Sequence, residues 1–173
     1  GGRRRRRQAL GMTAQARERV ARDALGQALA DGVAALGLEL PAGAHGRLLA
    51  YVGLLAKWNG VYNLTAIREP ERMVTHHLLD SLAVLPALDE LVAGRDAVRV
   101  LDVGSGAGLP GLPIAMARPA WQVVLREPVQ KKVACMTQAV AELAVPNAHP
   151  SLGRVEDLPP VPGYAIVISR AFS

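Results

Sequence analysis

The sequence of 173 residues has little of several features that would define a class of protein. It contains one cysteine, Cys135, and 3% aromatic residues. A single thiol excludes an internal disulfide framework and is typical of a reducing compartment. Its four histidines, His45, His76, His77 and His149, lack the spacing of zinc ligands, so we expect no metal. No apolar run is long enough to cross a bilayer, and the early arginines are not followed by the apolar stretch of a signal peptide. We therefore expect a cytoplasmic protein with no membrane partner.

The positive charge is confined to one short segment. The net charge is +5, and residues 3–7 are five consecutive arginines, so the rest of the chain is electrically balanced. A run of like charges near a terminus is typical of a disordered extension, and it can also bind phosphate by releasing counterions. We interpret residues 1–12 as a basic disordered tail, with Met12 as a candidate for the true start, and assign this run no function.

The first half of the chain is predicted to be helical. Apolar residues recur there at three- and four-residue spacing among charged ones, as an amphipathic helix requires. We expect helices over residues 13–38, 41–58 and 69–91. Gly26 and Gly32 are expected to break the first helix in two, because glycine is a poor helix former.

The second half alternates strands with helices. Short apolar runs predict strands over residues 98–103, 121–125 and 164–169, a weak edge strand over 147–152 that is interrupted by Pro150, and helices over 112–117 and 129–143. This alternation predicts an α/β fold with a parallel, doubly wound sheet that binds its ligand beyond the carboxyl ends of the strands. We expect a helical region over residues 13–96 that forms one compact unit with a partial α/β core over 97–173.

A glycine-rich turn follows the first predicted strand, where residues 101–113 read LDVGSGAGLPGLP. Gly104, Gly106 and Gly108 would let the backbone approach a ligand closely. The dinucleotide-binding pattern G-x-G-x-x-G is not matched when it starts at Gly104. It is matched when it starts at Gly106, but this start lies two residues after the end of the predicted strand. A P-loop is excluded because Leu112 stands where its lysine is required. The tight G-x-G-x-G turn suits S-adenosylmethionine better than a pyrophosphate.

An acidic residue closes the second predicted strand. Glu127 follows Gly104 by 23 positions, where a carboxylate can accept both hydrogen bonds of a ribose diol. The alternative for Glu127 is a solvated turn carboxylate beside Pro128. Glu156 and Asp157, which precede a proline-rich loop, are candidates for binding an adenine amino group or are simply solvated.

Three segments in a fixed order resemble one family. They are WNGVYNLTAIREPERMVTHHLLDSLAVLP at residues 58–86, LDVGSGAGLPGLPIA at 101–115 and ISRAF at 168–172. Together they resemble the ribosomal RNA small subunit methyltransferase G family, also called glucose-inhibited division protein B, from about residue 36 onward. The resemblance implies a Rossmann-like class I methyltransferase sheet with an N-terminal helical cap. It also implies S-adenosylmethionine-dependent methylation of guanine N7 in 16S ribosomal RNA, with the 16S RNA or the 30S subunit as partner and a monomeric chain.

The resemblance also assigns roles to individual residues. The expected cofactor-binding residues are Gly104, Gly106, Gly108, Leu109, Glu127, Val155, Glu156 and Arg170. The expected catalytic residues are Arg170, His77 and Asp80, with Asn63 and Thr65 helping to shape the nucleotide pocket. His77 and Asp80 could equally form a polar tie between cap and core. Lys131 and Lys132 are candidates for RNA phosphate or form an exposed helix face, and Tyr62 and Phe172 are candidates for base stacking.

The sequence departs from the family pattern at several points. Arg126, Glu127 and Pro128 replace a plainer apolar–Asp–Ser stretch, and His76 stands where a permanent charge is usual. The chain stops just after the fourth predicted strand, so we expect an incomplete sheet with that strand as an exposed edge. Two alternatives stay open, namely another class I methyltransferase acting on a small molecule or protein, and an inactive truncated relative.

Overall fold

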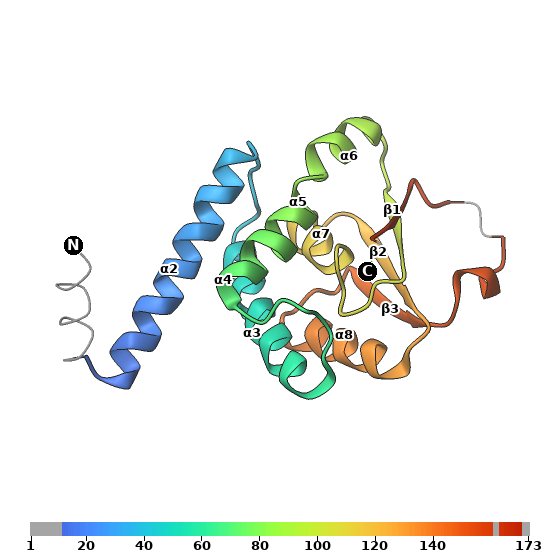
Figure 1. The fold of residues 1–173 in the computed structure, drawn as a ribbon. Coiled ribbons are helices and arrows are strands. Elements are labelled where there is room, and N and C mark those ends of the chain that lie inside the picture. Colours follow the sequence, from blue (N-terminus) through green and yellow to red (C-terminus); the bar gives the residue numbers. More distant parts are fainter. Residues whose placement is uncertain (1–11, 161–162, 171–173) are drawn as a thin grey trace.

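A computed structural model describes residues 12–160 and 163–170 of the chain. The arginine run at residues 3–7 and the stacking candidate Phe172 lie outside the described residues. Helices come first and a parallel sheet follows (Figure 1). The helical part contains α2 (Ala14–Ala35), α3 (Ala44–Tyr62), α4 (Pro70–Met73), η1 (Val74–Leu79), α5 (Asp80–Leu82) and α6 (Leu85–Leu91). The α/β part contains β1 (Arg99–Val103), α7 (Gly111–Ala117), β2 (Gln122–Glu127), α8 (Gln130–Glu142), β3 (Ala148–Leu152), η2 (Val155–Asp157) and β4 (Ile166–Ser169).

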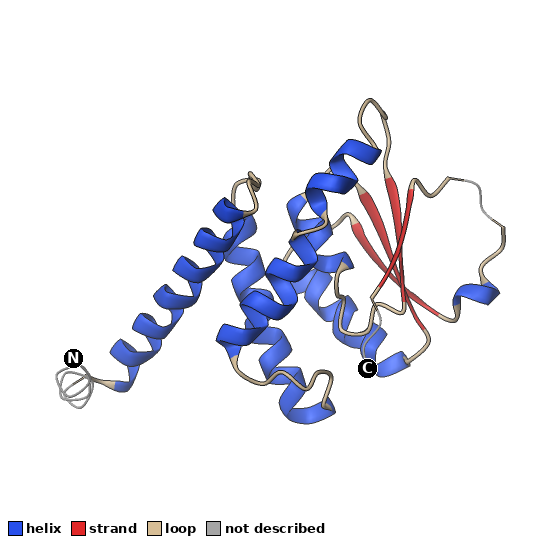
Figure 2. Ribbon diagram, turned by 45° about the horizontal axis from the view of Figure 1, so that its top comes forward, coloured by secondary structure: helices blue, strands red, loops and turns tan. Residues whose placement is uncertain are grey.

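The four strands form one parallel sheet in the order β3-β2-β1-β4. The expected edge strand is confirmed, because β3 lies at one edge and carries Pro150 there. β4 lies at the other edge of the sheet, and Val167 in it is 64% exposed. In Figure 2 the helices lie to one side of the sheet, apart from the short η2. A doubly wound sheet has helices on both faces. Among the described residues, the helices other than η2 cover one face of the sheet.

The long helix α2 is continuous, so the expected break at its glycines is wrong. Thr13 caps its start by accepting a hydrogen bond from Ala16 N at 3.2 Å. A Cβ at Gly32 would overlap the δ carbons of Leu79, which shows why a glycine stands inside this helix. The glycine lets α2 pack closely against η1, and this contact offsets its poor helix propensity.

The expected helix over residues 69–91 is divided into several pieces. It begins at Pro70 as expected, but residues Val74–Leu79 form a π-helical turn and a further break separates α5 from α6. A π-turn widens a helix and is frequent at functional sites, and the apolar periodicity does not predict one. Here the turn carries His76 and His77.

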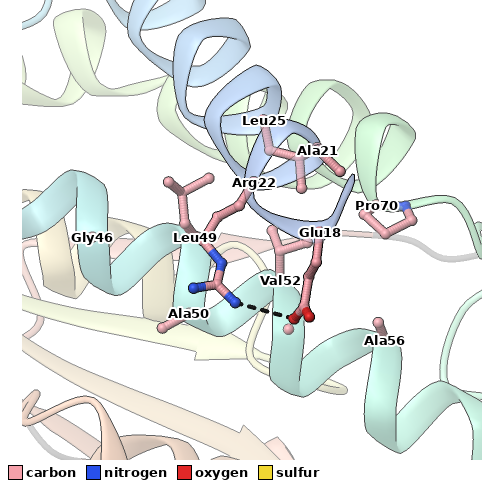
Figure 3. A pocket seen from close by; sticks show the side chains of 11 residues that line it. Glu18, Ala21, Arg22, Leu25, Gly46, Leu49, Ala50, Val52, Ala56 and Pro70 are labelled. Carbon is pink, nitrogen blue, oxygen red and sulfur yellow. Dashed lines mark hydrogen bonds and ion pairs between the residues drawn. The ribbon is translucent and has the colours of Figure 1, made fainter. Parts of the chain in front are cut away.

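A groove of about 600 Å³ lies between α2, α3 and the start of α4 (Figure 3). Its walls are mostly apolar, including Leu25 and Leu49, and its polar rim holds an ion pair of 3.2 Å between Glu18 and Arg22. The groove is lined by α2, α3 and Pro70, and no residue of the glycine turn takes part. The candidate site therefore lies elsewhere, at the carboxyl ends of the strands.

Candidate functional site

The glycine turn is held by the end of the neighbouring strand. Gly104, Gly106 and Gly108 have positive φ angles of 70°, 59° and 106°, which L side chains rarely adopt. The amides of Gly104 and Ser105 donate to the carbonyl of Arg126 at 2.8 and 3.1 Å. The end of β2 therefore fixes the turn that follows β1.

Gly104 and Gly108 of the turn, and Gly111 just after it, have different surroundings. Nothing lies within 4 Å of the position of a Cβ at Gly104, and this residue is exposed. A Cβ at Gly108 would overlap Leu112 and lie 3.2 Å from the Tyr51 hydroxyl. Gly111, which sequence reasoning did not single out, would place a Cβ 2.6 Å from Asp102 Oδ2. Of these three glycines, Gly104 thus has open space for a ligand, whereas Gly108 and Gly111 are required by internal packing.

An open cleft of about 370 Å³ lies beside Gly104. Its lining joins the end of β1, the end of β2 and the loop after β3 through Val103, Gly104, Arg126, Pro128, Gly153, Arg154, Val155 and Glu156. The structure thereby brings together three of the expected cofactor residues, Gly104, Val155 and Glu156, from segments far apart in the sequence. Two others, Gly106 and Leu109, are buried and line a smaller cavity of about 60 Å³ that also contacts Thr65 and Lys132.

Glu127 is buried at the end of β2, with 4% of its surface exposed. Its Oε2 accepts the amide of Gly106 at 2.8 Å and its Oε1 accepts the amide of Val129 at 3.2 Å. The interpretation as a solvated turn carboxylate is therefore wrong. Each carboxylate oxygen offers more than one acceptor position, so binding of a ribose hydroxyl stays a prediction.

Tyr51 of α3 ties the helical part to the glycine turn. The side chain is fully buried, and its hydroxyl donates to the carbonyl of Ala107 at 2.7 Å. Burial raises its pKa well above the ordinary value of 10.0, so the hydroxyl keeps its proton and stays a donor. Sequence reasoning missed this residue, although a tyrosine inside an apolar stripe is the available signal, since a buried phenol needs a partner.

Tyr51→Phe is expected to lower the free energy of unfolding by about 1–3 kcal/mol, because the Ala107 carbonyl is left buried without a partner. Urea unfolding of the variant and the parent chain measures this difference. Tyr164→Phe is the matched control, because its ring keeps the stacking with the Arg99 guanidinium 4.6 Å away. Equal stability of Tyr51→Phe and the parent would contradict the assigned role.

Asp102 lies under the glycine turn and is completely buried. Its Oδ2 accepts the amide of Gly111 at 2.9 Å, whereas its Oδ1 has no hydrogen-bond partner among the described residues. Burial raises the pKa of this carboxyl from 3.8 to about 7, and the hydrogen bond from the Gly111 amide acts against that shift. The Ser105 hydroxyl donates to the backbone carbonyl of Asp102 at 3.0 Å. A carboxyl that titrates near neutral pH therefore supports the start of α7.

The expected catalytic residues meet beside the end of β4. Arg170 donates from Nη2 to the carbonyl of His76 at 2.8 Å and lies 3.4 Å from Asp80 Oδ2. His77 is 2% exposed, and its Nε2 lies 2.9 Å from Thr65 Oγ1. Burial and then the charge of Arg170 lower the pKa of His77 below 6.5, so the ring is neutral at pH 7. Asp80 therefore ties the helical part to the end of β4 through Arg170, in agreement with the expected polar tie between cap and core, whereas His77 contacts Thr65.

The surface candidates lie around the end of α3. Lys131 places its Nζ 5.9 Å from the centre of the Tyr62 ring, and Tyr62 is 46% exposed. Asn63 adopts a left-handed conformation with φ 49° and accepts a hydrogen bond from Arg68 at 3.2 Å. Lys132 lines the small cavity with Thr65. Asn63 is thus occupied at the surface, whereas Thr65 is the residue that contacts His77.

The part of the chain that the structure describes has neither a cluster of metal ligands nor a membrane-spanning helix. Within residues 12–160 and 163–170, no three His, Cys, Asp or Glu side chains are grouped as metal ligands. The helices of the same residues are all too short or too polar to cross a membrane.

Two solved structures resemble parts of this fold. The YcgJ protein from Bacillus subtilis has a TM-score of 0.41 at 27% identity, covering 50% of this chain and 36% of its own. Coclaurine N-methyltransferase bound to N-methylheliamine and SAH has a TM-score of 0.45 at 15% identity, covering 95% of this chain and 45% of its own. Both TM-scores are below 0.5, so neither likeness contributes to the assignment.

The sequence comparisons are decisive. The family model described as rRNA small subunit methyltransferase G, GidB, matches residues 44–173. The protein named ribosomal RNA small subunit methyltransferase G from Burkholderia cenocepacia is 51% identical over 166 residues, covering 94% of this chain and 71% of its own length. The protein of that name from Azoarcus sp. is 52% identical over 145 residues, covering 84% of this chain and 66% of its own. With this family model over residues 44–173 and these identities, the chain belongs to the rRNA small subunit methyltransferase G family.

Proposed function

We propose that the chain transfers a methyl group from S-adenosylmethionine to N7 of a guanine in 16S ribosomal RNA. The observation that carries the proposal is the match to the family model over residues 44–173, and the cleft beside Gly104 lies where a parallel α/β sheet binds its ligand. The 30S subunit or its RNA is then the partner.

The cleft fits an adenosine-containing cofactor. Gly104 offers backbone without a side chain next to open space, and Val155 and Glu156 form the opposite wall. We assign the methionyl side to the glycine turn and the adenine side to the loop at residues 153–157. We assign the ribose to Glu127, whose carboxylate accepts the Gly106 amide and which directly follows Arg126 in the lining of the cleft.

The chemistry asks little of the protein besides positioning. The sulfonium of S-adenosylmethionine supplies an activated methyl group when bound, and N7 of guanine carries an in-plane lone pair with no proton to remove. A general base is therefore unnecessary. Holding the guanine in line with the methyl group makes the displacement effectively unimolecular, which contributes several kcal/mol of catalysis.

We assign the guanine side of the site to the cluster of Arg170, His77 and Asp80. Arg170 is held by the His76 carbonyl and Asp80, so its charge has a fixed position. His77 is neutral and fixed by Thr65, which suits a group that orients a base rather than one that moves a proton. The guanine must leave its stack at a cost of a few kcal/mol, and exposed Tyr62 with Lys131 is our candidate for holding the neighbouring RNA.

The test combines cofactor binding with methyl transfer. Calorimetric titration of the chain with S-adenosylhomocysteine is expected to give a saturable one-to-one isotherm. Labelled S-adenosylmethionine is then incubated with the chain and 30S particles that lack this methyl group, and nucleoside analysis is expected to show 7-methylguanosine. Binding with transfer to a different acceptor would favour another class I methyltransferase. A folded chain that binds no S-adenosylhomocysteine would favour an inactive relative.

A further inference from the structure

Arg126, the residue before Glu127, joins the two walls of the cleft. Its backbone carbonyl accepts the amides of Gly104 and Ser105 at 2.8 and 3.1 Å, on the side of the glycine turn. Its side chain points the other way along the sheet edge, toward the loop after β3. The sequence singled out Arg126 only as a departure from the family pattern.

The guanidinium of Arg126 donates to three acceptors, two at the end of β3 and one in the loop that follows it. Nε donates to the carbonyl of Arg154 at 3.0 Å, and Nη1 donates to the Leu152 carbonyl at 2.9 Å and to Ser151 Oγ at 2.8 Å. These are charge-assisted bonds with a planar fork, which an ammonium group cannot reproduce in one geometry.

Gly153 accommodates this guanidinium. It has a φ of 134°, and a Cβ there would overlap Arg126 Nη2 and lie 2.7 Å from its Cζ. The Gly153 amide donates to the Glu127 carbonyl at 3.0 Å, which is the backbone part of the same tie. The bonds that Asp157 and Leu158 make run back to Arg154 and Val155 within the loop. Among the described residues, the loop at 153–158 is thus fastened to the body of the protein through the end of β2.

We propose that Arg126 is a positioning residue for the cofactor, which holds the loop at residues 153–157 at a fixed distance from the glycine turn. The inference rests on the proposed function, because it takes this loop as the adenine-binding wall. Its physical basis is preorganisation, since a wall that is already ordered loses less conformational entropy when the cofactor binds. The guanidinium acts on affinity through the loop and takes no part in methyl transfer.

The experiment compares Arg126→Met with the parent chain. We expect the Kd for S-adenosylhomocysteine to rise about tenfold, because an apolar side chain leaves the loop unfastened. Arg126→Lys is expected to restore part of the affinity, since it keeps the charge but not the fork. In methyl transfer to 30S particles, the KM for S-adenosylmethionine should rise while kcat at saturating cofactor stays within about twofold.

The matched control is Arg118→Met, which removes another arginine with a two-bond fork. Arg118 binds both oxygens of Asp89 at 2.8 and 2.6 Å, at the other end of β2. This variant should lower the melting temperature and leave the Kd for S-adenosylhomocysteine unchanged. Hydrogen exchange at the amides of residues 153–158 should be faster in Arg126→Met only.

The outcomes separate this inference from the proposed function. An unchanged Kd and unchanged exchange in Arg126→Met, with a parent chain that binds, would overturn the role of Arg126 and leave the proposed function intact. A parent chain that binds no S-adenosylhomocysteine would overturn both. If Arg126→Met does not fold, Arg126→Lys and Ser151→Ala carry the test, each with an expected rise in Kd of about threefold.

Discussion

Gly104→Asp is expected to raise the Kd for S-adenosylhomocysteine at least about 100-fold, which corresponds to roughly 2.7 kcal/mol of binding free energy. At Gly104 the protein backbone can approach the proposed cofactor most closely. A carboxylate there would fill the open space and add a negative charge. The chain itself should remain folded, because no protein atom lies within 4 Å of the new Cβ. The φ of 70° makes any side chain cost about 1 kcal/mol of stability. Calorimetry of the variant measures the loss of binding.

The matched control for this substitution is Gly94→Asp. Gly94 has a φ of 78° and equally open surroundings, and it precedes β1 instead of following it. The two variants therefore carry the same backbone strain and the same new charge, at opposite ends of one strand. Gly94→Asp should bind S-adenosylhomocysteine like the parent. Similar losses in both variants would show that strain explains the effect, and normal binding by Gly104→Asp would place the cofactor elsewhere.

The α/β order could be predicted from the sequence because its signals are local. β1 and β2 are apolar, β-branched runs, and a glycine turn separates β1 from the helix that packs on it. Pro150 predicts an edge strand for the same local reason, since it cannot donate to a ladder. The position of Gly104 next to an open cleft follows from these elements, because parallel strands end at one edge of the sheet.

The features that the sequence could not provide depend on distant partners. Gly32 predicts a helix break, and only its contact with Leu79 explains why a glycine stands there. The apolar spacing of residues 74–79 does not distinguish a π-turn from an α-helix. Glu127 has the same sequence context whether it faces solvent or Gly106, and only the packing of the glycine turn decides between them. The carbonyl groups that accept from Tyr51 and Arg126 could not be predicted, because any residue type supplies a carbonyl.

Asp102 makes the fold itself sensitive to pH near neutrality. Its pKa is raised to about 7 in the folded chain from an ordinary value of 3.8, so the folded state holds this proton more tightly than the unfolded state. The contribution of this carboxyl to the free energy of unfolding is therefore highest at low pH, and it is lost as the pH rises from about 4 to about 7. His77 acts in the opposite direction, because its lowered pKa favours the folded state as the pH rises.

Asp102→Asn removes the titration and keeps an oxygen that can accept the Gly111 amide. At pH 5 the protonated parent is expected to be the more stable chain, because the asparagine amide buries two N–H donors where the protonated carboxyl buries one O–H. Between pH 5 and pH 8 the stability of the variant relative to the parent should rise by roughly 3 kcal/mol, which is two pKa units at 1.36 kcal/mol each. Urea unfolding of both chains at the two pH values measures this change, and His77 cancels because both chains contain it. A difference that stays constant with pH would show that Asp102 is already ionised at pH 5, because the Gly111 amide stabilises the carboxylate more strongly than burial opposes it.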